Sequence, residues 1–160
     1  MNTSRRANLK KQNHPSHGGK ILIILSIDYG DTRSGLALCD KLELLASPLT
    51  VITERKQKLL IEKIAALAEE HRAETLLVGL PKNMNGSLGE RAEICVDFAE
   101  KLKTATNLPV EMWDERLSTV GANSLLNETG NKGKKRKQII DAVAATMILQ
   151  NFLDYRKTNR

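Results

Sequence analysis

The feature that most constrains this chain is a continuous apolar run near its N-terminus. Residues 21–27 read ILIILSI, and the next residue is Asp28. A run of this length, rich in β-branched side chains and without polar alternation, is typical of a strand that is buried on both faces of a sheet. We therefore expect a sheet that is covered by other elements on both sides.

Four further strands are expected after this run. A turn at residues 29–35 leads into a second apolar run, so the first two strands form a hairpin. The strands predicted after the turn cover residues 36–39, 46–52, 75–79 and 109–113.

Helices are expected between the later strands and at the end of the chain. Apolar residues with helical spacing predict a helix over residues 55–72, and Ser87 with Glu90 forms a capping box that begins a second helix. A short helix is expected from Ser118 or Thr119 to about Asn127. The last helix ends near Asp154, and its predicted buried face contains Ile140, Val143, Ala144, Met147 and Ile148.

This order of elements predicts the fold class. Three strands joined by hairpins, followed by strands that alternate with helices, indicate an α/β domain with one mixed five-stranded sheet covered by helices. The 160 residues suffice for one such domain, which we place at residues 21–156. No apolar run approaches the ~18–20 residues of a membrane span, so no membrane association is expected. Two cysteines, Cys39 and Cys95, are too few for a disulfide framework, and we expect both to be buried in a protein of a reducing compartment.

Positive charge is concentrated in two segments. The net charge is +6, and residues 1–20 contain five basic and no acidic side chains. This segment lacks apolar periodicity, and we expect it to be a disordered tail. A second basic cluster lies in residues 128–137, which we expect to be a loop. Polyanions are the natural partners of such clusters, although a solubilising tail and a solvated loop are the simpler alternatives.

Acidic side chains stand where predicted elements end or begin. Asp28 ends the first strand, Asp114 and Glu115 end the fifth, and Asp141 interrupts the apolar start of the last helix. If both strands are central, these acids can converge. Hard oxygen ligands of this type suit Mg²⁺ or Mn²⁺, and two such ions can hold a phosphodiester for attack by water. Alternatively, Asp28 forms only a turn, and Asp141 is only a favourable charge near a helix N-terminus.

The turn after the first strand allows a competing interpretation. Asp28-Tyr29-Gly30-Asp31-Thr32 has the Asp-x-Gly-x-Thr pattern with which sugar-kinase and actin-like proteins hold ATP phosphates. Those proteins need two such domains and a much longer chain. We therefore disfavour an ATPase.

Four segments together resemble the YqgF/RuvX family of pre-16S rRNA nucleases, which are similar to Holliday-junction resolvases. They lie at residues 27–37, 78–87, 114–120 and 141–145, in the order and with the spacing of the family. The resemblance implies a ribonuclease H-like fold and a metal-dependent nuclease of the cytoplasm. The sequence departs from the family at Asn85, Leu88 and Gly121, which affects loop contacts and none of the proposed metal ligands.

The resemblance also implies which residues form the site. Asp28, Glu115 and Asp141 would be the catalytic metal ligands for Mg²⁺ or Mn²⁺. Strand alternation places Asp114 and Glu115 on opposite faces, and we favour Glu115. The expected contacts to nucleic acid are Arg33, Asn83, Arg116, Lys132, Lys134, Lys135, Arg136 and Lys137, with Asn85 as a further polar candidate.

The leading hypothesis is a Mg²⁺-dependent endonuclease that matures the 5′ end of pre-16S rRNA, with ribosomal particles as candidate partners. A DNA four-way junction is the second candidate substrate. A non-catalytic RNA-binding factor is the alternative from another class, because it would need the basic segments but not the carboxylates. The sequence leaves open whether the protein is a monomer or a homodimer.

Overall fold

The computed structural model describes residues 20–117 and 134–159. Its single sheet has the strand order β3-β2-β1-β4-β5, in which β1 is antiparallel to β2, β2 is antiparallel to β3, and β1, β4 and β5 are parallel. The strands are β1 (Ile24–Asp28), β2 (Arg33–Cys39), β3 (Ala46–Thr53), β4 (Thr75–Leu80) and β5 (Val110–Asp114). The mixed five-stranded sheet is thus confirmed. The predicted tail, except Lys20, and the predicted helix over residues 118–127 lie outside the described residues.

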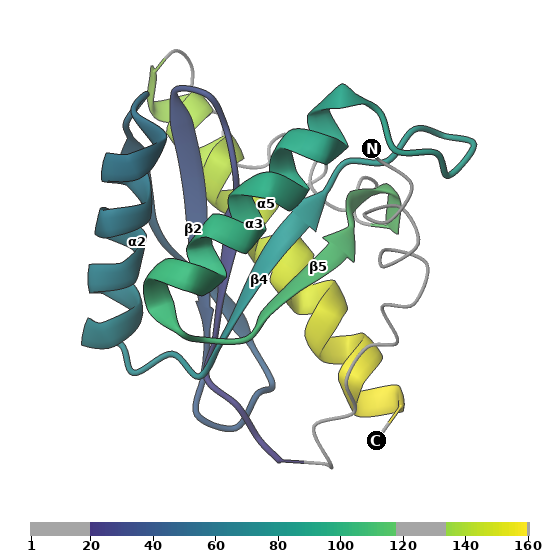
Figure 1. Ribbon diagram of the computed structural model, residues 1–160. Coiled ribbons are helices and arrows are strands. Elements are labelled where there is room, and N and C mark those ends of the chain that lie inside the picture. The colour runs from purple at the N-terminus through teal and green to yellow at the C-terminus, as the bar shows by residue number, and fades with distance from the viewer. Residues whose placement is uncertain (1–19, 118–133, 160) are drawn as a thin grey trace.

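Within the described residues, three α-helices cover the two faces of the sheet. Figure 1 shows α2 (Gln57–Glu70) and α3 (Glu90–Thr106) on one face and α5 (Lys134–Thr158) crossing the other. A short 3₁₀ helix, η1 (Glu115–Leu117), follows β5. None of the helices in the described parts of the chain combines the length and the apolar character that a membrane span requires.

The strand β1 lies at the centre of the sheet, and its side chains pack into two hydrophobic clusters, one on each face. Leu25 and Ile27 pack into the cluster beneath α2 and α3, whereas Ile24 packs into the cluster beneath α5. Ser26 also faces α5, where its hydroxyl donates a hydrogen bond of 2.7 Å to the carbonyl of Ala145. The uninterrupted apolar run is therefore explained by helices on both faces.

The last helix begins earlier and ends later than the sequence analysis predicted. The predicted basic loop over residues 128–137 is wrong in its last four positions, because Lys134–Lys137 form the first turn of α5, which continues to Thr158. Lys and Arg are good helix formers, so a basic segment can extend a helix as easily as it can form a loop.

The predicted buried face of α5 is also partly wrong. Val143, Ala144 and Met147 are only partly buried, and Ile148 alone of the four described candidates is fully buried. The residues that fill the core are Ala145, Ile148, Leu149, Phe152 and Leu153. Because the apolar residues of this helix lie on more than one of its faces, the spacing of these residues does not identify the buried face.

The predicted capping box of α3 does not form. The residue before the helix is Gly89, which provides no side-chain cap. The Ser87 hydroxyl instead donates to Asn85 Oδ1 at 2.6 Å and accepts from Asn83 Nδ2 at 3.0 Å. Ser87 therefore shapes the preceding loop rather than the helix start.

Both cysteines are buried as predicted, and burial raises the pKa of the Cys95 thiol to about 11.

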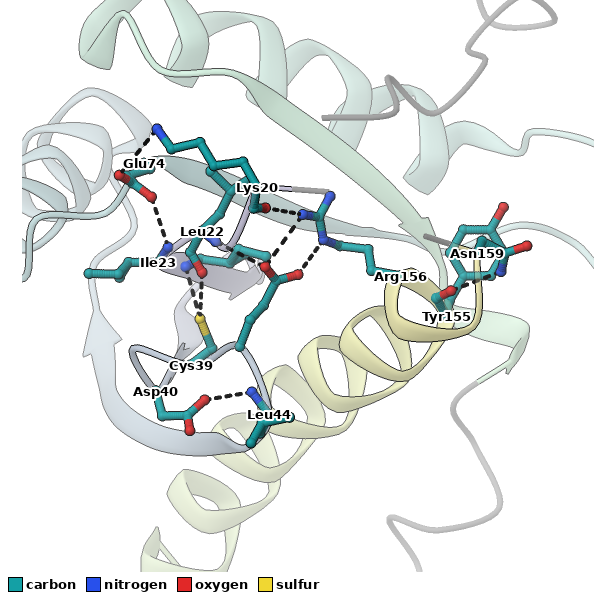
Figure 2. Close-up of polar contacts among 12 residues, drawn as sticks. Lys20, Leu22, Ile23, Cys39, Asp40, Leu44, Glu74, Tyr155, Arg156 and Asn159 are labelled. Carbon is teal, nitrogen blue, oxygen red and sulfur yellow. Dashed lines mark hydrogen bonds and ion pairs between the residues drawn. The ribbon is translucent and has the colours of Figure 1, made fainter. Parts of the chain in front are cut away.

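A buried ion pair closes the end of the molecule where β1 begins. The Glu43 carboxylate has no exposed surface and accepts hydrogen bonds from the Arg156 guanidinium and from the Leu22 amide. Arg156 also donates to the Lys20 carbonyl at 3.1 Å. Figure 2 shows the hydrogen bond from Arg156 of α5 to the carbonyl of Lys20. This cluster fixes the C-terminal part of α5 against the entry to the sheet.

Candidate active site

Two carboxylates come together where the parallel strands end. The strands β1, β4 and β5 run in one direction, so their carboxyl ends share one edge of the sheet. Asp28 is the last residue of β1, and Glu115 follows β5 directly. The carboxyl groups of the two side chains lie within hydrogen-bonding reach of each other. The structure thus brings two of the predicted site residues into contact.

The Glu115 carboxyl has an altered acidity. Burial raises its pKa above the ordinary value of 4.5, and the nearby charge of Asp114 raises it further. The hydrogen bond from Asp28 and the positive charge of Arg91 act in the opposite direction but do not cancel the effect of burial. Two acids in direct contact hold a proton more readily than isolated ones do, because the proton relieves their repulsion.

Asp114 points elsewhere. Its carboxylate accepts hydrogen bonds from Nε and Nη2 of Arg116, at 3.0 and 2.6 Å, and lies 4.0 Å from Lys82 Nζ. The hydrogen bonds from Arg116 lower the pKa of Asp114. The geometry therefore distinguishes the two neighbouring acids. Glu115 reaches Asp28, whereas Asp114 pairs with the basic side chains of Arg116 and Lys82.

A loop between β4 and α3 borders this edge. Arg116 Nη1 donates to the Met84 carbonyl at 3.3 Å, and the Gly86 amide donates to the Asn83 carbonyl at 2.8 Å. Gly86 has a positive φ of 84°, which glycine adopts without strain. Asn85 Oδ1 accepts from the amide and hydroxyl of Ser87. The amides of Asn83 and Asn85, which we expected to contact nucleic acid, thus shape the loop, and Arg116 fastens it to β5.

The sequence analysis missed Arg91, in the first turns of α3. Arg91 donates hydrogen bonds to Asp31 Oδ1 at 2.8 Å and to the Tyr29 carbonyl. Its guanidinium lies over the Tyr29 ring, 4.9 Å from the centroid, and that ring stacks on Phe98. Arg91 therefore holds the turn that follows Asp28. A single Arg on a helix gives no local signal of a contact with a turn 60 residues away.

The backbone of α5 approaches the same edge. Ala145 is fixed to Ser26 of β1, while Arg156 lies at the opposite end of that strand. The direction of α5 therefore carries Asp141, one turn before Ala145, toward the end of β1 where Asp28 lies. The Asp141 side chain lies outside the described residues.

For the remaining residues predicted to contact nucleic acid, the structure gives mainly the position of the backbone. Arg33 begins β2 at the turn beside Asp28, on the same edge of the sheet. Lys134, Lys135, Arg136 and Lys137 lie on the first turn of α5, with side chains outside the description, and Lys132 lies outside it entirely.

The chemistry of this edge fits a hard divalent cation. Two carboxyl groups in contact present oxygen ligands at one point, and a cation can bind there in place of a proton. Among the described side chains there is no group of three acidic, histidine or cysteine residues that could hold a metal ion. The described part of the site is therefore a pair of acids. A third ligand would have to come from a residue whose side chain the structure does not describe.

Comparison with known proteins identifies the family of the chain. A family model described as "RuvX: Holliday junction resolvase" matches residues 22–155. The chain belongs to this RuvX family. A relative from Halothermothrix orenii, named "Putative pre-16S rRNA nuclease", is 46% identical over 133 residues, which are 83% of this chain and 95% of the relative. A relative of the same name from Clostridium kluyveri is 42% identical over 131 residues, 82% of this chain and 96% of the relative.

Solved structures confirm the ribonuclease H-like fold. Thermus thermophilus RuvC in complex with a Holliday junction has a TM-score of 0.57 at 14% identity, covering 86% of this chain and 96% of RuvC. The yeast mitochondrial resolvase Ydc2 has a TM-score of 0.54 at 11% identity, covering 86% of this chain and 80% of Ydc2. At such identities the comparison establishes the RuvX chain's fold alone.

Proposed function

We propose that this RuvX-family protein is a divalent-metal-dependent endonuclease that hydrolyses phosphodiester bonds in RNA, in the 5′-end maturation of pre-16S rRNA. The contact between Asp28 and Glu115 at the carboxyl edge of the sheet carries this proposal. The relatives from Halothermothrix orenii and Clostridium kluyveri, at 46% and 42% identity, are named "Putative pre-16S rRNA nuclease", which supports a pre-16S rRNA substrate. A protein with this role acts in the cytoplasm.

The proposed ligands of the cation are Asp28, Glu115 and Asp141. Bound Mg²⁺ or Mn²⁺ would supply Lewis acidity and would lower the pKa of a coordinated water. The chain's own residues would prepare this edge. Arg91 holds the turn after Asp28, and Asp114 anchors Arg116, which fastens the bordering loop. Arg33 and the basic first turn of α5 would attract the phosphate backbone.

The experiment uses labelled RNA that spans the 5′ processing site of pre-16S rRNA. Purified protein is incubated with this RNA, free or within immature ribosomal particles, with Mg²⁺ or with EDTA. Asp28→Asn keeps the size of the side chain and removes the charge. Asp97→Asn is the matched control, because Asp97 lies on α3 and pairs with Lys101.

The proposal expects Mg²⁺-dependent cleavage by the wild type and by Asp97→Asn, and loss of cleavage in EDTA and in Asp28→Asn. Cleavage that survives in Asp28→Asn would contradict the metal site. Salt-sensitive binding in all three proteins without cleavage of either RNA sample would favour a non-catalytic RNA-binding factor.

A DNA four-way junction is the second candidate substrate, because the matching family model is described as a Holliday junction resolvase. The same three proteins are therefore tested on a labelled junction. Junction cleavage without RNA cleavage would assign the active site to resolution. A resolvase must cut two strands, so a strictly monomeric protein on the junction would count against this substrate.

A further inference from the structure

We infer that Gly79 is a positioning residue, whose missing side chain leaves the space through which Glu115 reaches Asp28. The inference rests on the proposed function, because it assigns Gly79 to the assembly of the proposed metal site. It uses an observation that the proposed function does not need, which is the space around one residue of β4.

The topology makes Glu115 cross β4. The sheet order places β4 between β1 and β5, so residues at the ends of β1 and β5 are about 10 Å apart, twice the spacing of neighbouring strands. Gly79 pairs with Trp113 of β5 and lies one residue beyond the pair formed by Val78 and Ile27 of β1. Gly79 is thus the residue of β4 that lies level with Asp28.

The face of the strand is also the required one. Leu77, two residues before Gly79, packs into the core beneath α5, on the face where Ser26 of β1 meets Ala145. Residues two apart on a strand share a face. Gly79 and Asp28 therefore both lie on the face that α5 covers.

A side chain at position 79 would occupy the place of the Glu115 carboxylate. A Cβ built on Gly79 would lie 2.2 Å from Glu115 Oε1, 3.0 Å from Glu115 Cδ and 2.9 Å from Ile148 Cδ1. Conformational freedom does not explain this glycine, because Gly86 is the only glycine with positive φ among the described residues. Space is the property that Gly79 provides.

The nearest atoms decide which property a substitution would change. Oε1 and Cδ1 end flexible side chains, so the fold can accept an alanine if those side chains move. Movement of Ile148 changes only packing. Movement of Glu115 takes its carboxylate away from Asp28. Gly79→Ala is therefore expected to preserve the fold and to damage the site.

The test compares the wild type, Gly79→Ala and the double variant Gly79→Ala/Ile148→Val. Valine lacks Cδ1, so the double variant removes the collision with α5 and keeps the collision with Glu115. Mn²⁺ affinity is measured by calorimetry and thermal stability by the unfolding midpoint. The metal-free crystal structure of Gly79→Ala locates the Glu115 carboxylate.

The inference expects Gly79→Ala to weaken Mn²⁺ binding about 10- to 100-fold, the usual effect of disturbing the support of a metal ligand. The double variant should bind Mn²⁺ no better than Gly79→Ala does, the midpoint should shift by only a few degrees, and the crystal structure should show the carboxylate displaced from Asp28. Recovery of Mn²⁺ affinity in the double variant would overturn the inference, because Gly79 would then serve helix packing.

Failure of the proposed function gives a different result. If the wild type binds no Mn²⁺, the proposed metal site is wrong. The crystal structure then decides the inference by itself: a Glu115 carboxylate displaced from Asp28 supports the positioning role, and one that stays on Asp28 overturns it.

Discussion

Glu43, which is buried, and Glu115, which is half-buried, lie at opposite ends of the sheet and have different partners. Glu43 lies at the end where β1 begins, and its partners are the Arg156 guanidinium and the Leu22 amide. Glu115 lies at the end where β1 finishes, and its hydrogen-bond partner is a second acid, Asp28. The charge of Glu43 is thus balanced within the chain. At the other end two acids are in contact, and such a contact favours the binding of a proton or a cation.

This difference separates a charge that supports the fold from one that suits the proposed metal site. A buried carboxylate with an arginine and an amide as partners has its charge compensated and both oxygens hydrogen-bonded, and the loss of these partners should change stability. Two carboxylates in contact repel each other when both are ionised, and acids whose pKa is shifted by such surroundings are common at functional sites. We therefore expect mutations at the two ends to affect different properties.

The largest effect is expected at the Glu43 end. Arg156→Met leaves the Glu43 carboxylate buried without its cation, which should lower the free energy of unfolding by about 3–5 kcal/mol. Urea denaturation measures this loss. Lys157→Met, at an exposed neighbouring position, should change stability little. Equal stability of the two variants would show that the ion pair does not hold α5 to the sheet.

Glu115→Gln should have the opposite profile. Cleavage should fall about 100-fold or more, since even the supporting groups of metal ligands are worth 10- to 100-fold. The metal-free protein should be at least as stable as the wild type, because the amide removes a desolvated charge beside Asp28. Single-turnover cleavage and metal-free thermal unfolding provide the two readouts. Full activity in this variant would remove Glu115 from the site.

The stability of the metal-free protein should depend on pH through Glu115. Burial raises the pKa of Glu115 above 4.5, so the folded state binds this proton more tightly than the unfolded state does. This contribution to stability is present below the unfolded pKa and is lost as pH rises through the raised, folded pKa. The advantage of Glu115→Gln over the wild type should therefore grow with pH across this range. Unfolding midpoints measured in parallel check it, and an advantage independent of pH would contradict the assigned cause.

The smallest effect is expected at the loop beside the acid pair. Arg116→Ala removes the donor to the Met84 carbonyl and the partner of Asp114. Amides of the loop, including that of Gly86, should exchange with deuterium faster, whereas those of β1 should keep their protection. Hydrogen exchange read by mass spectrometry measures both. Unchanged loop exchange would mean that the turn holds itself through Asn83 and Ser87.

The strands and the acid pair were predictable because local chemistry determines them. The apolar run of β1 indicated a strand with two covered faces, and acids at strand ends indicated an edge site. The resemblance favoured Glu115 over Asp114, and the structure brings Glu115 to Asp28.

The missed features depend on distant partners. Glu43 and Arg156 are 113 residues apart, and Arg91 is 60 residues from Asp31. Neither pair leaves a periodic signal in the sequence. The first turn of α5 was missed because lysine and arginine suit a loop and a helix alike. The role inferred for Gly79 could not be predicted from the sequence, because it depends on where the Glu115 side chain lies in the folded protein.

The most direct test of the central claim is a Mn²⁺ titration of metal-free protein by calorimetry, with wild type, Asp28→Asn and Asp97→Asn measured side by side. The account predicts that the wild type and Asp97→Asn bind Mn²⁺ with equal affinity and that Asp28→Asn loses this binding. Equal affinity in all three proteins would contradict it, because the cation would then bind away from the acid pair of Asp28 and Glu115.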